Sequence, residues 1–106
     1  MVQDMDHSML KQALREGKIR WSTHCLERMN ERDISILDVK ECILQGEIIE
    51  DYPTDFPHPS CLVYAITANQ KVIHVVAGYD GDYIYFITAY YPSSSKFEPD
   101  MKTRRN

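Results

Sequence analysis

The chain is organised around one stretch, Trp21-Ser22-Thr23-His24-Cys25-Leu26-Glu27-Arg28-Met29-Asn30-Glu31-Arg32. Ser22 or Thr23 is a good N-cap, because either hydroxyl can accept a hydrogen bond from an unpaired amide of the first helical turn. The residues that follow predict about two and a half turns of amphipathic helix. Cys25 and Met29 fall on its apolar arc, which we expect to face a core.

A polar stripe lies beside that apolar arc, because residues four positions apart share one side of a helix. It holds His24, Arg28 and Arg32, and Glu27 flanks it. An imidazole and two guanidiniums in line are suited to holding a phosphate and moving a proton. An ordinary solvated helical face is the alternative interpretation.

Length and composition indicate one globular domain of 106 residues, with 43% hydrophobic and 26% charged residues. The N-terminal residues lack the layout of a signal peptide, and no apolar run approaches the roughly 20 residues that span a bilayer. The three cysteines are odd in number and widely spaced, which favours reduced thiols in the cytoplasm. Neither metal-ligand spacing nor a Gly-rich phosphate loop occurs, so we expect no metal and no cofactor.

Charge is distributed unevenly although the net charge is only −4. Residues 1–32 carry six Lys/Arg against five Asp/Glu, whereas residues 33–100 carry three against eleven. Residues 101–106 add three positive charges. A polyanion would therefore bind at the N-terminal helices or the C-terminal tail.

The first half of the chain reads as helical, since its apolar residues recur at spacings of three and four. Helices are predicted at residues 4–16, 23–32 and 35–45. Gly17 and Gly46 end the first and third of these, and Ser35 with Asp38 forms a capping box. Lys18 to Trp21 is expected to be a short extended link.

From Glu47 onward the periodicity changes to that of strands, which predicts an α+β domain with a four-stranded antiparallel meander. The strands are predicted at residues 47–52, 61–68, 72–79 and 83–90, with the last hairpin turning at Asp80-Gly81. We divide the chain into an additional N-terminal helix, one α+β domain and a polar, basic, mobile tail: residues 1–17, 18–92 and 93–106. The predicted core includes Met29, Val39, Ile43, Leu62, Val75 and Ile87.

Several ordered segments carry a resemblance: Trp21-Ser22-Thr23-His24, Glu27-Arg28-Met29, Arg32-Asp33-Ile34-Ser35, Gly46-Glu47-Ile48-Ile49-Glu50, Ile73-His74-Val75-Val76 and Ile87-Thr88-Ala89-Tyr90. Over about residues 19–105 the chain resembles a small bacterial family, domain of unknown function 4258. That family is distantly similar to the RelE/ParE and BrnT-type toxins of toxin–antitoxin pairs. The resemblance implies packed helices on an antiparallel sheet and cleavage of free or ribosome-bound RNA. It also implies a partner of the zinc-finger antitoxin type.

Metal-independent RNA cleavage needs a base for the 2′-hydroxyl proton, an acid for the leaving oxygen and cations near the phosphate. His24 suits the base, because the dipole at a helix N-terminus disfavours its charged form. Arg28 and Arg32 are the predicted phosphate clamps, and Glu27 orients His24. The alternatives are that His24 caps the helix and that Arg28 pairs with Glu31 on the surface.

His74 and Tyr90 are the predicted sources of the acid, although a histidine among strand valines is more often a satisfied core residue. A two-residue turn at Asp80-Gly81 would set His74 opposite Ile87, leaving Tyr90 on the other face. A one-residue bulge would instead bring Thr88 opposite His74. The sequence leaves these registers open.

Two functions follow from the sequence. The first is a toxin-type, metal-independent endoribonuclease, favoured by the resemblance and by the His/Arg stripe. The alternative is a non-catalytic protein-binding module on the same fold, favoured by the acidic second half of the chain. The sequence predicts neither an RNA specificity nor an oligomeric state.

Overall fold

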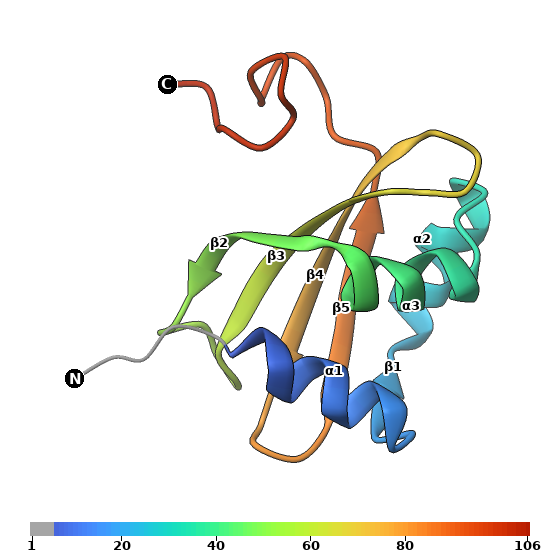
Figure 1. Cartoon of the computed structure of the whole chain (residues 1–106), viewed down its shortest axis with the longest axis vertical. Coiled ribbons are helices and arrows are strands. Elements are labelled where there is room, and N and C mark those ends of the chain that lie inside the picture. The colour runs from blue at the N-terminus through green and yellow to red at the C-terminus, as the bar shows by residue number, and fades with distance from the viewer. Residues whose placement is uncertain (1–5) are drawn as a thin grey trace.

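A computed structural model describes residues 6–106, which form three helices and a five-stranded sheet (Figure 1). The elements in chain order are α1 (His7–Arg15), β1 (Ile19–Trp21), α2 (Thr23–Glu31), α3 (Ile36–Gln45), β2 (Glu47–Tyr52), β3 (Ser60–Ile66), β4 (Val72–Tyr79) and β5 (Ile84–Tyr90). The predicted α+β class is confirmed, and the first two residues of the first predicted helix lie outside the described residues. Every helix within residues 6–106 is too short to cross a membrane.

The helices α2 and α3 begin where local chemistry predicts, whereas α1 begins at His7, after its N-cap Asp6, and not at residue 4. Ser22, rather than Thr23, is the N-cap of α2, and its hydroxyl accepts the Cys25 N–H at 3.0 Å. The capping box at the start of α3 is present, with Ser35 and Asp38 bonded in both directions. Local sequence therefore determines where β1 ends and α2 begins, and so where the polar stripe of α2 starts.

The sheet is mixed, with strand order β1-β5-β4-β3-β2, and not wholly antiparallel with four strands as predicted. The extra strand is the predicted link before α2. It pairs parallel to β5, with Ile19 opposite Ile84 and Trp21 opposite Phe86. The Ile84 N–H also donates to the Lys18 carbonyl at 2.9 Å. A three-residue strand is too short to show a periodicity, and its partner lies far along the chain, so no local pattern indicated this pairing.

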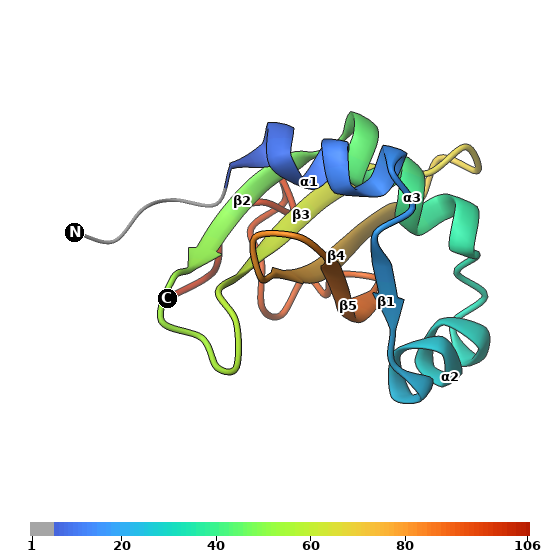
Figure 2. The ribbon, with the colours of Figure 1, turned by 90° about the horizontal axis from the view of Figure 1, so that it is seen from below.

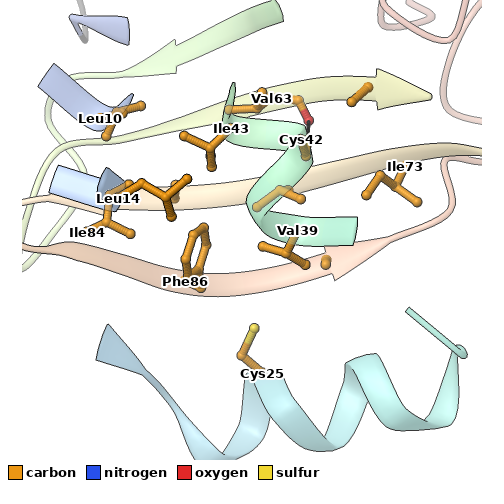
Figure 3. Close-up of a cluster of buried hydrophobic side chains, with 14 of the residues drawn as sticks. Leu10, Leu14, Cys25, Val39, Cys42, Ile43, Val63, Ile73, Ile84 and Phe86 are labelled. Carbon is orange, nitrogen blue, oxygen red and sulfur yellow. Dashed lines mark hydrogen bonds between the residues drawn. The ribbon is translucent and has the colours of Figure 1, made fainter. Parts of the chain in front are cut away.

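The main core lies between one face of the sheet and the helices α1 and α3, which Figure 2 shows on the same side. Figure 3 shows Val39, Cys42 and Ile43 of α3 pointing toward the strands, and Cys25 of α2 pointing toward Phe86. The predicted core residues Met29, Val39, Ile43, Leu62 and Val75 are all buried. The helix predicted as an addition supplies part of this core, through Leu10, Ala13 and Leu14.

Ile87 is a wrong core prediction, since 42% of it is exposed. The register explains the error. Val76 pairs with Thr88 while Ala77 pairs with Phe86, so Ile87 is the extra residue of a β-bulge. Tyr79 pairs with Ile84, and the hairpin loop is thus longer than the two-residue turn that the sequence suggested.

The second face of the sheet, opposite α1 and α3, carries Leu62, Tyr64, His74, Tyr85 and Tyr90. Residues 93–106, predicted as a mobile tail and here called the C-terminal segment, lie against this face. Phe97 is 2% exposed, and it forms an isolated β-bridge with Arg104. The Arg104 guanidinium also lies 4.7 Å from the centre of the Phe97 ring. Two of the predicted site residues, His74 and Tyr90, lie on this second face.

Candidate functional site

Three of the predicted site residues, His24, Arg32 and Tyr90, line two separate hollows. The first, here called the histidine hollow, has a volume of about 470 Å³. Its lining residues are Arg20, Trp21, Ser22, His24, Asp55, Phe56, Pro57, His58, Gly78, Tyr85, Phe86 and Ile87. The second, here called the cationic hollow, has a volume of about 360 Å³. Its lining residues are Arg32, Tyr90, Tyr91, Ser93, Lys96, Phe97 and Arg104.

Neither of these two hollows, both formed by residues 6–106, brings His24, Arg28 and Arg32 together. His24 lines the histidine hollow, Arg32 lines the cationic hollow, and Arg28 lines neither. The reason is the length of α2, since eight residues of helix separate His24 from Arg32 by about 12 Å along the axis. The residues of a stripe lie on one side of a helix, but the residues at its two ends can line different hollows.

His24 is the second residue of α2, and its side chain is exposed. The Ser22 cap fixes the first turn, while the pairing of β1 with β5 holds that turn beside the strand carrying Tyr85. His24 therefore lies on a rigid element at the mouth of the histidine hollow. Its helix-terminal position leaves it near the positive end of the α2 dipole, as the sequence predicted.

His58 is a site residue that the sequence analysis missed. It comes from the loop between β2 and β3, which Figure 2 shows on the side of the sheet away from α1 and α3. Its ring stacks on Tyr85, with ring centres 4.8 Å apart. Ser60 holds the loop by donating to the Asp55 carboxylate at 2.6 Å, and the Tyr79 N–H donates to the Pro59 carbonyl at 3.1 Å. A second imidazole thus reaches the hollow of His24.

Asp80 provides a fixed negative charge close to His58. Its carboxylate accepts the Tyr83 N–H at 2.7 Å, the Tyr85 hydroxyl at 2.7 Å and the Asp82 N–H at 2.8 Å. These bonds, the one from the Tyr83 backbone first, lower the pKa of Asp80 to about 2. Asp80 is thus ionised at neutral pH and, through Tyr85, positions the ring on which His58 stacks.

Arg20 is the guanidinium of the histidine hollow. It lies 4.5 Å from the centre of the Tyr83 ring, and it makes no ion pair within residues 6–106. Phe56, at the rim of the hollow, is 91% exposed. No group of three or more His, Cys, Asp or Glu residues in the described part of the chain could hold a metal ion. The hollow therefore combines two imidazoles, one guanidinium and an exposed aromatic ring.

Arg28 and Glu27, the other predicted site residues of α2, lie in ordinary surface environments. Arg28 donates to the Glu31 carboxylate at 2.8 Å, an exposed pair worth well under about 1 kcal/mol. Glu27 is exposed, and no hydrogen bond links it to His24 within residues 6–106. The pair agrees with the alternative interpretation, in which Arg28 forms an ion pair with Glu31 on the surface. Glu27 forms no hydrogen bond among the described residues that would orient His24.

His74 and Tyr90 are partners on the second face, and the register places Thr88 on that face with them. His74 is fully buried. One ring nitrogen, Nε2, donates to the Met101 carbonyl at 2.7 Å, and Nδ1 lies 3.4 Å from the Tyr90 hydroxyl. Burial lowers the pKa of His74 and raises the pKa of Tyr90, so both are neutral near pH 7. A buried imidazole engaged at both nitrogens positions Tyr90 and does not itself reach a substrate.

The cationic hollow is built from α2, the end of β5 and the C-terminal segment. Arg32 donates from Nη1 to the Ala89 carbonyl at 2.8 Å, and Arg104 forms a two-pronged pair with Glu50 at 3.0 and 3.2 Å. Lys96 makes no ion pair among the described residues. Three cations therefore meet in one hollow, and one carboxylate pairs with one of them.

Comparison with known proteins gives one match. A family model described as "Domain of unknown function (DUF4258)" matches residues 21–91. No curated protein and no solved structure matches the chain. The matched range includes His24, Arg32, His58, His74 and Tyr90, whereas α1 and the C-terminal segment lie outside it.

Proposed function

We propose that this chain, which belongs to the family described as "Domain of unknown function (DUF4258)", is a metal-independent endoribonuclease of the bacterial toxin type. One observation carries the proposal. His24 of α2 and His58 of the β2–β3 loop line the same hollow, together with the guanidinium of Arg20. Base, acid and cation are the three groups that this cleavage needs within reach of one phosphate.

The reaction is an attack of the 2′-hydroxyl on the adjacent phosphorus. His24 takes the 2′-hydroxyl proton, the new P–O2′ bond forms, and the P–O5′ bond breaks as His58 gives its proton to the departing 5′ oxygen. The products are a 2′,3′-cyclic phosphate and a 5′-hydroxyl, so no water or further reactant is consumed in this step. Each positioned proton-transfer group contributes about 10²–10⁴-fold to such a reaction.

The two histidines reach the hollow from different elements. His24 lies in the first turn of α2 at the mouth of the hollow, and we assign it the role of the base. His58 stacks on Tyr85 on the loop side of the hollow, and we assign it the role of the acid. Arg20, held over Tyr83, supplies the positive charge for the phosphorane oxygens.

Phe56 supports the choice of single-stranded RNA as the substrate. A largely exposed phenylalanine on a loop contributes little to folding, but its ring can stack on an unpaired base. The walls of the histidine hollow include Trp21, Pro57 and Ile87, which can accommodate the apolar faces of a base. We therefore place the base beside Phe56 and the scissile phosphate between the two imidazoles.

A specific surface supports the binding of a protein partner, which both a toxin–antitoxin pair and the alternative function, a protein-binding module, require. Ile36, Leu37 and Ile66 are 47%, 65% and 55% exposed. Leu37 and Ile66 line a third hollow of about 330 Å³ between α3 and the end of β3. This hollow contains no residue of the histidine hollow. In a toxin–antitoxin pair acting in the cytoplasm, we propose it as the docking site of a zinc-finger-type antitoxin.

The test is cleavage of an end-labelled single-stranded RNA by the purified full chain in EDTA, with the product ends identified. The proposal predicts a 2′,3′-cyclic phosphate, and a loss of about 10²–10⁴-fold in His24→Ala and in His58→Ala with unchanged thermal melts. Glu27→Ala, an exposed neighbour of His24 on α2, is the control and should cleave normally. Undiminished cleavage by both histidine variants would contradict the proposal.

Growth on induced expression separates the two functions in cells. Arrest by the wild-type chain but not by His24→Ala supports the nuclease. Capture of a partner encoded beside this chain, lost in Ile66→Glu and retained in His24→Ala, supports the docking surface. If expression never arrests growth, with or without that neighbour, and no RNA is cleaved, the binding module is the better account.

A further inference from the structure

We propose that the cationic hollow is a second phosphate subsite, which holds the RNA backbone away from the bond that is cut. This inference rests on the proposed function, since it extends the same substrate along the molecule. Its lining combines Arg32, Lys96 and Arg104 with the phenols of Tyr90 and Tyr91. Guanidiniums and hydroxyls are the usual contacts of phosphate oxygens.

The cationic hollow gathers positive charges in a chain whose second half is acidic. Residues 33–100 carry three Lys/Arg against eleven Asp/Glu, yet Lys96 is one of those three and lies in this hollow. Only Arg104, among its three cations, forms an ion pair within residues 6–106. Like charges gathered in a concavity without matching carboxylates raise the local concentration of anions. The hollow is therefore electrostatically prepared for an anionic ligand.

The two guanidiniums are held in place before any ligand binds. Arg32 is anchored through Nη1 alone, which donates to the Ala89 carbonyl at 2.8 Å and to the Thr88 hydroxyl at 3.5 Å. Arg104 is anchored on Glu50 through Nε and Nη2, and it lies over the buried Phe97 ring. A guanidinium has five N–H donors, so both keep donors that these bonds do not use. Little side-chain entropy remains to be lost when a phosphate binds.

The tyrosines of the hollow are also positioned. Tyr90 is backed by His74, with the ring centres 5.4 Å apart, and the His74 ring is fixed by Met101. Tyr91 directs its hydroxyl to the Asp33 carbonyl at 3.3 Å, and Lys71 lies 5.6 Å from the centre of its ring. Lys71 thus adds positive charge next to the hollow. A positive groove beside aromatic rings is the arrangement by which proteins bind single strands.

The two hollows lie along the same two elements. From β5, Tyr85 and Ile87 line the histidine hollow, whereas Tyr90, its last residue, and Tyr91, which follows the strand, line the cationic hollow. From α2, His24 lines the first and Arg32 the second, about 12 Å apart along the helix axis. One phosphate cannot reach both. The ligand that fits is a single strand long enough to present phosphates to each hollow.

The experiment uses the full chain carrying His24→Ala, so that the RNA is not cut, and a fluorescein-labelled single-stranded RNA as the probe. Fluorescence anisotropy gives the Kd over a range of salt concentrations. Adding Lys96→Ala should weaken binding by roughly tenfold and reduce the slope of log K against log salt by about 0.7, the value for one phosphate contact. Lys11→Ala on α1, at the opposite layer of the molecule, is the matched control and should change neither quantity.

An acidic protein partner is the competing occupant, and polyglutamate of matched charge tests it. Binding of polyglutamate with the affinity of the RNA would overturn the inference, as would an RNA affinity and salt slope unchanged by Lys96→Ala. Absence of RNA binding would overturn it as well.

The two proposals can fail separately. Normal cleavage by the wild-type chain with no effect of Lys96→Ala removes the subsite and leaves the nuclease. RNA binding that depends on Lys96, without cleavage by the wild-type chain, removes the nuclease and leaves an RNA-binding surface.

Discussion

The Nε2 nitrogen of His74 donates a hydrogen bond to the carbonyl oxygen of Met101 at 2.7 Å. His74 belongs to β4, the central strand of the sheet, and Met101 to the C-terminal segment. The bond ties that segment, which lies outside the family match, to β4, which lies within it. It also fixes the ring that supports Tyr90, so the stability of the fold and the shape of the cationic hollow depend on the same histidine.

The stability of the protein should fall as the pH drops below about 6.5, the usual pKa of histidine. Burial lowers the pKa of His74 in the folded state, so the unfolded chain binds a proton first as the pH decreases. The contribution of neutral His74 is complete above the unfolded pKa and is lost as the pH falls through the folded one. Urea midpoints between pH 8 and pH 5 measure this. His74→Gln should be less stable at pH 8 and flatter with pH; an equally steep dependence would contradict the assignment.

Phe97 of the C-terminal segment and Phe56 of the β2–β3 loop form a matched pair for testing stability. Phe97→Ala should cost about 3–5 kcal/mol, because it empties a buried site under Arg104. Phe56→Ala should cost less than about 0.5 kcal/mol, because the ring is 91% exposed, yet it should weaken RNA cleavage. Chemical unfolding and cleavage assays on both variants check this. Equal losses of stability would show that the C-terminal segment does not pack as described.

A second matched pair tests the main core. Ile43→Ala should destabilise by roughly 2–5 kcal/mol, since Ile43 is fully buried between α3 and the sheet. Ile66→Ala removes the same atoms from a residue that is 55% exposed, and it should cost far less. Urea unfolding gives both values. A free energy of unfolding that Ile43→Ala leaves unchanged would mean that the face of α3 assigned to the core is wrong.

Arginine substitutions separate the site from the surface. Arg20→Lys should reduce cleavage by about tenfold or more, because a point charge does not reproduce the planar contact with a phosphate. Arg28→Lys should leave cleavage nearly unchanged, since Arg28 pairs with Glu31 on the surface. Single-turnover cleavage at saturating RNA measures the difference. A larger loss of cleavage in Arg28→Lys than in Arg20→Lys would contradict this assignment and support the stripe of α2 as the phosphate clamp.

The sequence predicted those features that neighbouring residues decide. The caps at Ser22 and Ser35 place the starts of α2 and α3, because capping is a contact between residues three apart. The change of periodicity at Gly46 marks where helices give way to strands, as found. His24 could also be placed at a helix N-terminus for the same local reason.

Contacts between distant segments decided the rest. The parallel pairing of β1 with β5 and the bulge at Ile87 depend on strands far apart in the chain, and the bulge shifts which residues face His74. His58 lies in a proline-rich loop whose path is set by Tyr85 and Ser60, and no local pattern reveals it. The one signal in the sequence was a histidine near an aromatic residue in a loop, which alone is too common to single out.

The pH dependence of kcat/KM for RNA cleavage tests the central claim most directly. A base that must be deprotonated and an acid that must be protonated give a bell-shaped profile. We predict that the residual activity of His24→Ala loses the acidic limb, and that of His58→Ala loses the alkaline limb. Both limbs retained in each variant, with cleavage at the wild-type rate, would show that the two histidines of this hollow do not carry the reaction.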